Sequence, residues 1–144
     1  MKIRIDIFNV RPLLFGTLLL FSGCTTMQSY EGPKLPPENV ALIKGSFGMV
    51  NLVSILEVDG KARGFTEETA EMLPGEHTIR VQVTSGFGAF SPQYIGNKKL
   101  SFRASAGHTY KVDGTIKKVD RFDRIVFVWI VDEKTNEVVA GERP

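Results

Sequence analysis

Strict alternation of apolar and polar residues is the clearest pattern along the chain. In residues 77–83 (HTIRVQV), Ile79, Val81 and Val83 alternate with polar side chains. A period of two is typical of a strand that buries one face. Residues 99–104 repeat the pattern, so we predict two half-buried strands in this part of the chain.

Shorter apolar runs, separated by turn residues, predict the other strands. These lie at residues 39–44, 49–58, 61–65, 110–116, 125–131 and 137–140. The pair Asp59-Gly60 is a strong tight-turn signal. Residues 125–131 (IVFVWIV) are apolar at every position, so we expect them to form the most buried strand. About seven short strands favour an all-β fold, either an antiparallel β-sandwich or a small open barrel.

Residues 66–72 (TEETAEM) are the one stretch in which we predict a helical turn. Thr66 begins a capping box, but Thr69 stands where the box needs Glu or Gln. A single turn, ended by the turn residues Pro74 and Gly75, is all that this pattern supports.

The N-terminal residues have the pattern of a secretory signal. Residues 1–12 carry net positive charge, residues 13–21 form a mostly apolar run of nine, and the small residues Ser22 and Gly23 follow. A bilayer core needs about 20 apolar residues, and no later run is that long. We therefore predict a cleaved signal helix over residues 1–23.

The sequence Leu20-Phe21-Ser22-Gly23-Cys24 resembles a lipobox, the recognition site of the bacterial lipoprotein signal peptidase. The resemblance implies cleavage before Cys24 and lipidation of Cys24 by diacylglycerol, with acylation of its amine by a chain such as palmitate. Several acyl chains give stable anchoring where one is marginal. Phe21 departs from the commonest leucine. An ordinary signal with a chance cysteine, or a buried core cysteine, are the alternatives.

The resemblance also implies where the domain is held. Thr25 rather than Asp follows the cysteine, which in a Gram-negative host implies the outer membrane, with the domain facing the periplasm. In a Gram-positive host it implies the outer face of the cytoplasmic membrane. Residues 24–37 contain three prolines and predict an extended lipidated tether. The alternative is that residues 30–35 pack along the domain as an ordered arm. We predict the folded domain at residues 38–144.

Charge and cysteine content exclude several classes of function. Three of the 18 basic and one of the 16 acidic residues lie in residues 1–23, so 15 of each follow them. A neutral domain without a basic cluster is not expected to bind nucleic acid. The single cysteine excludes an internal disulfide and a zinc site built on several cysteines.

A second resemblance covers residues 55–83, which are similar to the PEGA-type module of bacterial surface and periplasmic proteins. It is carried by Asp59-Gly60 and by the turn Leu73-Pro74-Gly75 before the alternating strand; the literal Pro-Glu-Gly-Ala signature is absent. The longer frame also resembles small bacterial lipoproteins of uncharacterised role. This resemblance implies a β-sandwich with no known enzymatic activity.

His77 and His108 are the only histidines. A metal site would need a carboxylate partner such as Glu76 or Asp113. Both histidines begin predicted strands beside glycine turns, where hydrogen bonding to the turn is the ordinary role, so we favour the structural interpretation. The sequence contains no nucleophile elbow and no phosphate-binding loop, and we predict no cofactor or metal.

Residues 85–97 (SGFGAFSPQYIGN) are the most suggestive stretch for binding. Phe87, Phe90 and Tyr94 lie on a glycine-rich loop and could contact a partner. The alternative, which we favour, is that these rings fold down and close the end of the sandwich.

We therefore expect a lipid-anchored envelope protein, not an enzyme, with a binding or structural role at the membrane's periplasmic face. Its membrane contact is the lipid on Cys24, and its partner an envelope protein or peptidoglycan. The alternative is a small envelope enzyme or metal-binding protein that uses His77 or His108. Two distant histidines without facing carboxylates would contradict that alternative.

Overall fold

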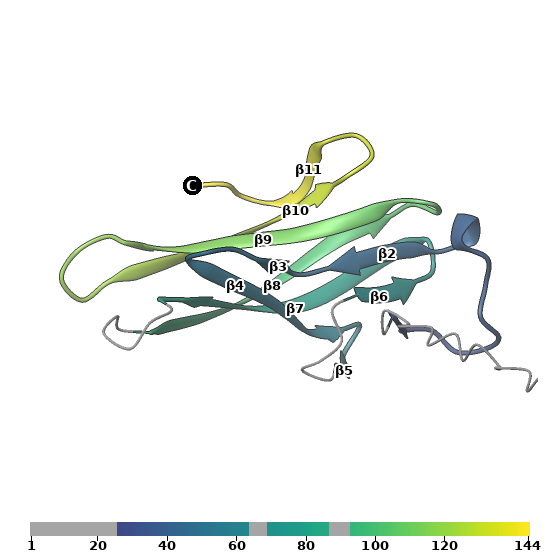
Figure 1. The fold of residues 1–144 in the computed structure, drawn as a ribbon, viewed down its shortest axis with the longest axis horizontal. Coiled ribbons are helices and arrows are strands. Elements are labelled where there is room, and N and C mark those ends of the chain that lie inside the picture. Colours follow the sequence, from purple (N-terminus) through teal and green to yellow (C-terminus); the bar gives the residue numbers. More distant parts are fainter. Residues whose placement is uncertain (1–25, 64–68, 87–92) are drawn as a thin grey trace, which may run out of the picture.

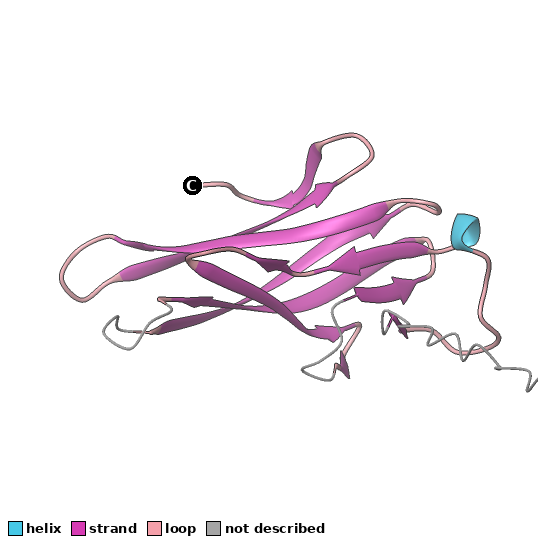
Figure 2. Ribbon diagram, in the orientation of Figure 1, coloured by secondary structure: helices cyan, strands magenta, loops and turns pink. Residues whose placement is uncertain are grey.

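A computed structural model describes residues 26–63, 69–86 and 93–144 of the chain, and nearly all of its regular structure is β (Figures 1 and 2). The strands are β1 (Thr26–Gln28), β2 (Ala41–Lys44), β3 (Ser46–Phe47), β4 (Asn51–Val58), β5 (Lys61–Ala62), β6 (Thr69–Met72), β7 (Gly75–Ser85), β8 (Tyr94–Ala104), β9 (Thr109–Lys118), β10 (Arg124–Asp132) and β11 (Glu137–Gly141). One short 3-10 helix, η1 (Pro37–Asn39), precedes β2. The predicted signal helix and Cys24 lie outside the described residues.

The strands form two sheets that face each other, which confirms the predicted all-β sandwich. The six-stranded sheet has the order β1-β6-β2-β9-β10-β11, and the other has the order β3-β4-β7-β8 with β5 paired to β4. The long neighbouring pairs β7–β8 and β9–β10 are antiparallel. Two pairs, β1–β6 and β2–β9, are parallel, and the sequence did not predict them.

The core lies between the sheets and is built from the inward positions of each strand. The predicted inward residues Ile79, Val81 and Val83 of β7 are fully buried. The facing sheet contributes Val112 and Ile130 to the same cluster. The alternation read from residues 77–83 is therefore confirmed.

The prediction that residues 125–131 form the most buried strand is wrong. In β10 only alternate residues, among them Val128 and Ile130, are buried, and Ile125 is half exposed. The reason is that β10 covers the core with one face, while its other face belongs to the outer side of the sheet. Strand β7 has more buried positions.

The predicted helical turn is also wrong where the structure describes it. Thr69–Met72 is strand β6, which lies between β1 and β2. A central position gives its backbone hydrogen-bonding partners on both sides, and this tertiary pairing overrides the weak local helix signal. Residues 66–68 lie outside the described part.

The N-terminal arm is paired to the sandwich rather than free of it. Strand β1 runs parallel to β6, with Thr26 beside Thr69. The ammonium of Lys34 lies 3.3 Å from the buried Glu71 carboxylate, and the Leu35 amide donates to the Tyr30 hydroxyl at 3.0 Å. The ordered-arm alternative therefore describes these residues better than an extended tether.

Candidate functional site

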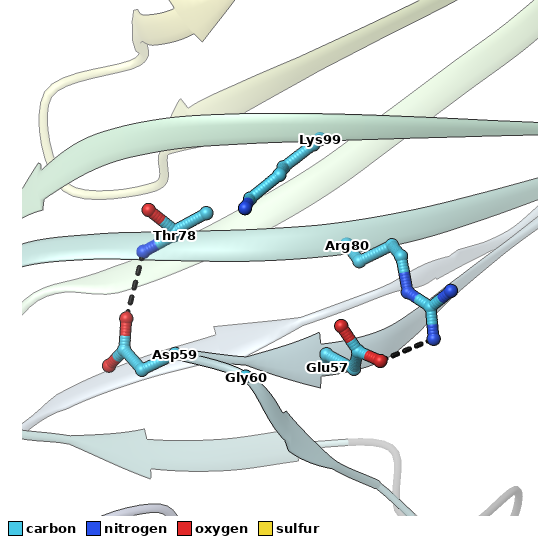
Figure 3. Close-up of a pocket in the computed structure, with 6 residues that line it drawn as sticks. All are labelled: Glu57, Asp59, Gly60, Thr78, Arg80 and Lys99. Carbon is cyan, nitrogen blue, oxygen red and sulfur yellow. Dashed lines mark hydrogen bonds and ion pairs between the residues drawn. The ribbon is translucent and has the colours of Figure 1, made fainter.

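A shallow polar pocket of about 240 Å³ lies on the outer face of the smaller sheet, where the β4–β5 turn meets β7 and β8 (Figure 3). It is lined by Glu57, Asp59, Gly60, Thr78, Arg80 and Lys99. These residues come from three adjacent strands and one turn, so the pairing of the sheet brings them together.

The wall of the pocket begins with the turn that the sequence predicted. Asp59 and Gly60 have φ angles of 50° and 78°, the left-handed values that a tight Asp-Gly turn requires. One Asp59 carboxylate oxygen accepts the Thr78 amide at 2.9 Å, and the other lies 2.6 Å from His77 Nδ1. The carboxylate thus fixes the β4–β5 turn to β7.

His77 joins this turn to the preceding one. Its Nε2 lies 2.6 Å from the Leu73 carbonyl oxygen, while its Nδ1 contacts Asp59. The Leu73 carbonyl oxygen can only accept, so His77 Nε2 donates to it, while Nδ1 faces the Asp59 carboxylate. Both ring nitrogens are engaged, which leaves neither for a metal ion. The two turn motifs of the sequence form one hydrogen-bonded unit.

The floor of the pocket is a row of charged side chains across three strands. Arg80 pairs with Glu57 on β4 and stands directly opposite Lys99 on β8. The Arg80 guanidinium donates to the Glu57 carboxylate, as Figure 3 shows. In the described part of the chain, the Lys99 ammonium has no hydrogen-bonding or ion-pair partner. In the next row, the hydroxyls of Thr78 and Ser101 lie 3.0 Å apart.

His108 is held in a second, separate pair. Its Nδ1 lies 2.6 Å from the carboxylate of Asp132, which is 5% exposed. Burial acts to raise the pKa of Asp132, but hydrogen bonds from His108 and from the backbone N–H groups of Lys134 and Thr135, with the charge of His108, outweigh it and hold the pKa below its ordinary value. The His108 ring stacks against Tyr110. The pair ties the start of β9 to the end of β10.

Each histidine therefore faces one aspartate, and neither pair uses the partners Glu76 or Asp113 considered from the sequence. Within the described ranges, no three His, Cys, Asp or Glu side chains come close enough to hold a metal ion. Both pairs join strands or turns, in keeping with the structural role favoured from the sequence. Because a carboxylate faces each histidine, the geometry does not by itself contradict the alternative.

A different feature occupies one end of the sandwich, which we call the apolar end. It comprises the exposed apolar side chains of the β3–β4 and β9–β10 turns, namely Phe47, Met49, Val50, Val119 and Phe122. Met49 is 98% and Phe122 is 83% exposed. Strand β3 contacts β9, and both turns lie towards the left of Figure 1. Large exposed apolar patches are typical of interaction sites in proteins, so the apolar end is a candidate binding surface.

The structure describes only part of the aromatic loop predicted from the sequence. Phe87 and Phe90 lie outside the described residues. Tyr94 begins β8, and the guanidinium of Arg124 lies 3.5 Å from the centre of its ring. This contact ties β8 to the start of β10, so Tyr94 has a structural partner and is only half exposed.

Comparison of the chain with protein-family models, curated proteins and solved structures gives no match. Among the residues described, no helix is long and apolar enough to cross a membrane. The lipobox and PEGA-type resemblances therefore stay predictions.

The sequence did not point to Glu57, Arg80 and Lys99 as neighbours, or to Asp59 and Asp132 as histidine partners. Alternation identified Arg80 as outward-facing. Which residues stand opposite it depends on the strand register, which alternation does not encode.

Proposed function

We propose that this chain is a lipid-anchored envelope domain that binds another protein through its apolar end. The observation that carries the binding role is the gathering of Met49, Phe122 and their exposed apolar neighbours on two turns at one end. The lipobox at residues 20–24 supports the anchor. We propose no catalytic role, since both histidines serve as links between turns or strands.

Strand β1, the described strand that follows the proposed anchor in the sequence, is well separated from the apolar end along the sandwich. Across the six-stranded sheet, Thr26 of β1 is aligned with Thr69 of β6, Lys44 of β2 and Lys111 of β9. From Lys111, β9 continues to Lys118, a distance of about 23 Å at the rise of a strand. Cys24 precedes Thr26 by two residues in the sequence. A lipid on Cys24 would hold the β1 edge close to the bilayer and leave the apolar end available elsewhere.

The charges of the β9–β10 turn favour a protein over a bilayer as the occupant. Asp120 lies at the tip, and its carboxylate accepts the amides of Phe122 and Asp123, each at 2.8 Å. Those bonds lower the pKa of Asp120, so it is ionised at neutral pH. Burying an ionised carboxylate in lipid is costly, whereas a protein partner can supply a donor to it. Acidic side chains of such a protein partner could pair with the neighbouring cations, which are Lys117, Lys118, Arg121 and Arg124.

The anchor is tested by mass spectrometry of the mature N-terminus. We expect the wild-type protein to begin at Cys24 with a diacylglyceryl thioether, and Cys24→Ser to accumulate as the uncut, unlipidated precursor. Cleavage at another bond, or an unmodified Cys24, would contradict the anchor and leave the binding surface untouched.

The binding surface is tested by site-specific photocrosslinking in intact cells. In separate variants, a photocrosslinking residue replaces Met49, Phe122 or Arg103. Arg103 is the control position, because it is exposed on β8. We expect the same protein adduct from Met49 and Phe122 and none from Arg103. Adducts with phospholipid alone would assign the apolar end to a membrane, and equal adducts from all three positions would mean non-specific contact.

A further inference from the structure

We infer that the pocket between the β4–β5 turn and β8 binds a small oxyanion, a carboxylate or a phosphate group, through Lys99. The inference extends the binding half of the proposed function and is independent of the lipid anchor. Four features carry it: an unpaired ammonium, an adjacent cation, two hydroxyls and carboxylates that are already engaged.

The charge of the floor row is not balanced. Like charges directly opposite each other in a sheet are destabilising, yet Arg80 and Lys99 occupy such positions. Glu57 neutralises Arg80, and no carboxylate in the described part of the chain pairs with Lys99. One positive charge is therefore left at the mouth of the pocket, where an anion would relieve the repulsion.

The pocket carboxylates do not compete strongly for that ammonium. Both oxygens of Asp59 are occupied, one by the Thr78 amide and the other by His77. One carboxylate oxygen of Glu57 accepts from Arg80, and the second oxygen is not used in that contact. Figure 3 shows the Lys99 side chain extending towards Thr78 rather than towards either carboxylate.

Hydrogen-bond donors complete the site for an oxyanion. The Thr78 and Ser101 hydroxyls bond each other, and only one of the two protons is used in that bond. The guanidinium of Arg80 has further N–H groups beyond the one on Glu57. An ammonium, a guanidinium and a hydroxyl form the donor set that suits carboxylate and phosphate oxygens. The second Glu57 oxygen would accept from a hydroxyl or amine beside the bound anion.

The test is calorimetric titration of the full-length protein, purified in detergent. It is titrated with acetate, with inorganic phosphate and, at matched ionic strength, with chloride. Variants are Lys99→Gln and the matched control Lys98→Gln. Lys98 precedes Lys99 on β8 and reaches towards the Val126 carbonyl oxygen, outside the pocket. Unchanged thermal unfolding of both variants verifies their folding.

We expect saturable binding of one anion per chain in the millimolar range. Lys99→Gln should weaken it about tenfold or more, as the loss of a charge-assisted hydrogen bond does, and Lys98→Gln should leave it unchanged. The acetate and phosphate titrations decide between the two oxyanions. Chloride binding of equal strength, no saturable binding, or equal losses in both variants would overturn the inference. None of these results depends on Cys24 or on the apolar end.

Discussion

At the scale of single residues, two aspartates hold the turns and strand ends of this sandwich. Asp59 links the β4–β5 turn to β7, and Asp132 links β10 to the residue before β9. Each aspartate carboxylate contacts a histidine ring nitrogen and accepts a hydrogen bond from a backbone amide. Asp132 is the buried one of the two, so its loss should have the clearer effect on stability.

We predict that Asp132→Asn lowers the free energy of unfolding at pH 7 by about 1–3 kcal/mol, because it removes charge-assisted hydrogen bonds from a buried site. The pKa of Asp132 is lowered from 3.8 in the folded state. Its stabilising contribution is therefore fully present above about pH 4 and is lost as the pH falls through the folded-state pKa. The difference between wild type and variant should narrow in that acidic range.

Urea unfolding at neutral pH and at about pH 3 measures both effects. Asp120→Asn is the comparison variant. Asp120 also accepts two backbone amides and has a lowered pKa, but it lies exposed in a turn, so its loss should destabilise the protein less. A variant difference that stays constant with pH would show that the charge of Asp132 does not contribute.

At the scale of elements, the two sheets approach each other closely at Gly114 of β9, which has no side chain. A Cβ atom on Gly114 would lie 2.7 Å from a Val83 methyl carbon and 3.0 Å from the Phe127 carbonyl oxygen. Val83 belongs to the opposite sheet. A glycine in a strand indicates a close approach without identifying the partner, so this contact could not be predicted from the sequence.

We predict that Gly114→Ala destabilises the protein by about 1–3 kcal/mol, since the added methyl group overpacks the space between the sheets. Thermal unfolding measures the change. Gly48→Ala is the matched control, because its Cβ would meet only the Asn51 carbonyl oxygen, at 3.6 Å. Equal stability of the two variants would mean that the sheets can separate at Gly114 without cost.

At the scale of the whole molecule, the apolar end is separate from the core. Its side chains are exposed, whereas the core lies between the sheets. Substitutions at the apolar end can therefore be made without disturbing the core, as the proposed binding role requires.

We predict that the double substitution Met49→Ser and Phe122→Ser changes the free energy of unfolding by less than about 1 kcal/mol, because both side chains are almost fully solvated. The same variant should bind less of a fluorescent hydrophobic dye. Val58→Ser, which places a hydroxyl in the core, is the contrasting control and should be strongly destabilised. A large loss of stability in the double variant would mean that these residues pack in the native state.

The sequence by itself determined the elements with a strong local signal. Alternation identified β7 and its inward residues Ile79, Val81 and Val83, and the pair Asp59-Gly60 identified the β4–β5 turn. Both signals are local, because side-chain period and left-handed φ angles are properties of a few neighbouring residues. The secretory pattern and the lipobox resemblance at Cys24 likewise rest on a short local stretch.

Only the tertiary structure decided which strands and side chains meet. It made Thr69–Met72 a strand between β1 and β2, exposed one face of β10, and aligned Glu57, Arg80 and Lys99 in one row. It also gathered the β3–β4 and β9–β10 turns at one end. The physical reason is that strand pairing and register depend on contacts between residues far apart in the chain, and a local pattern carries no information about the partner.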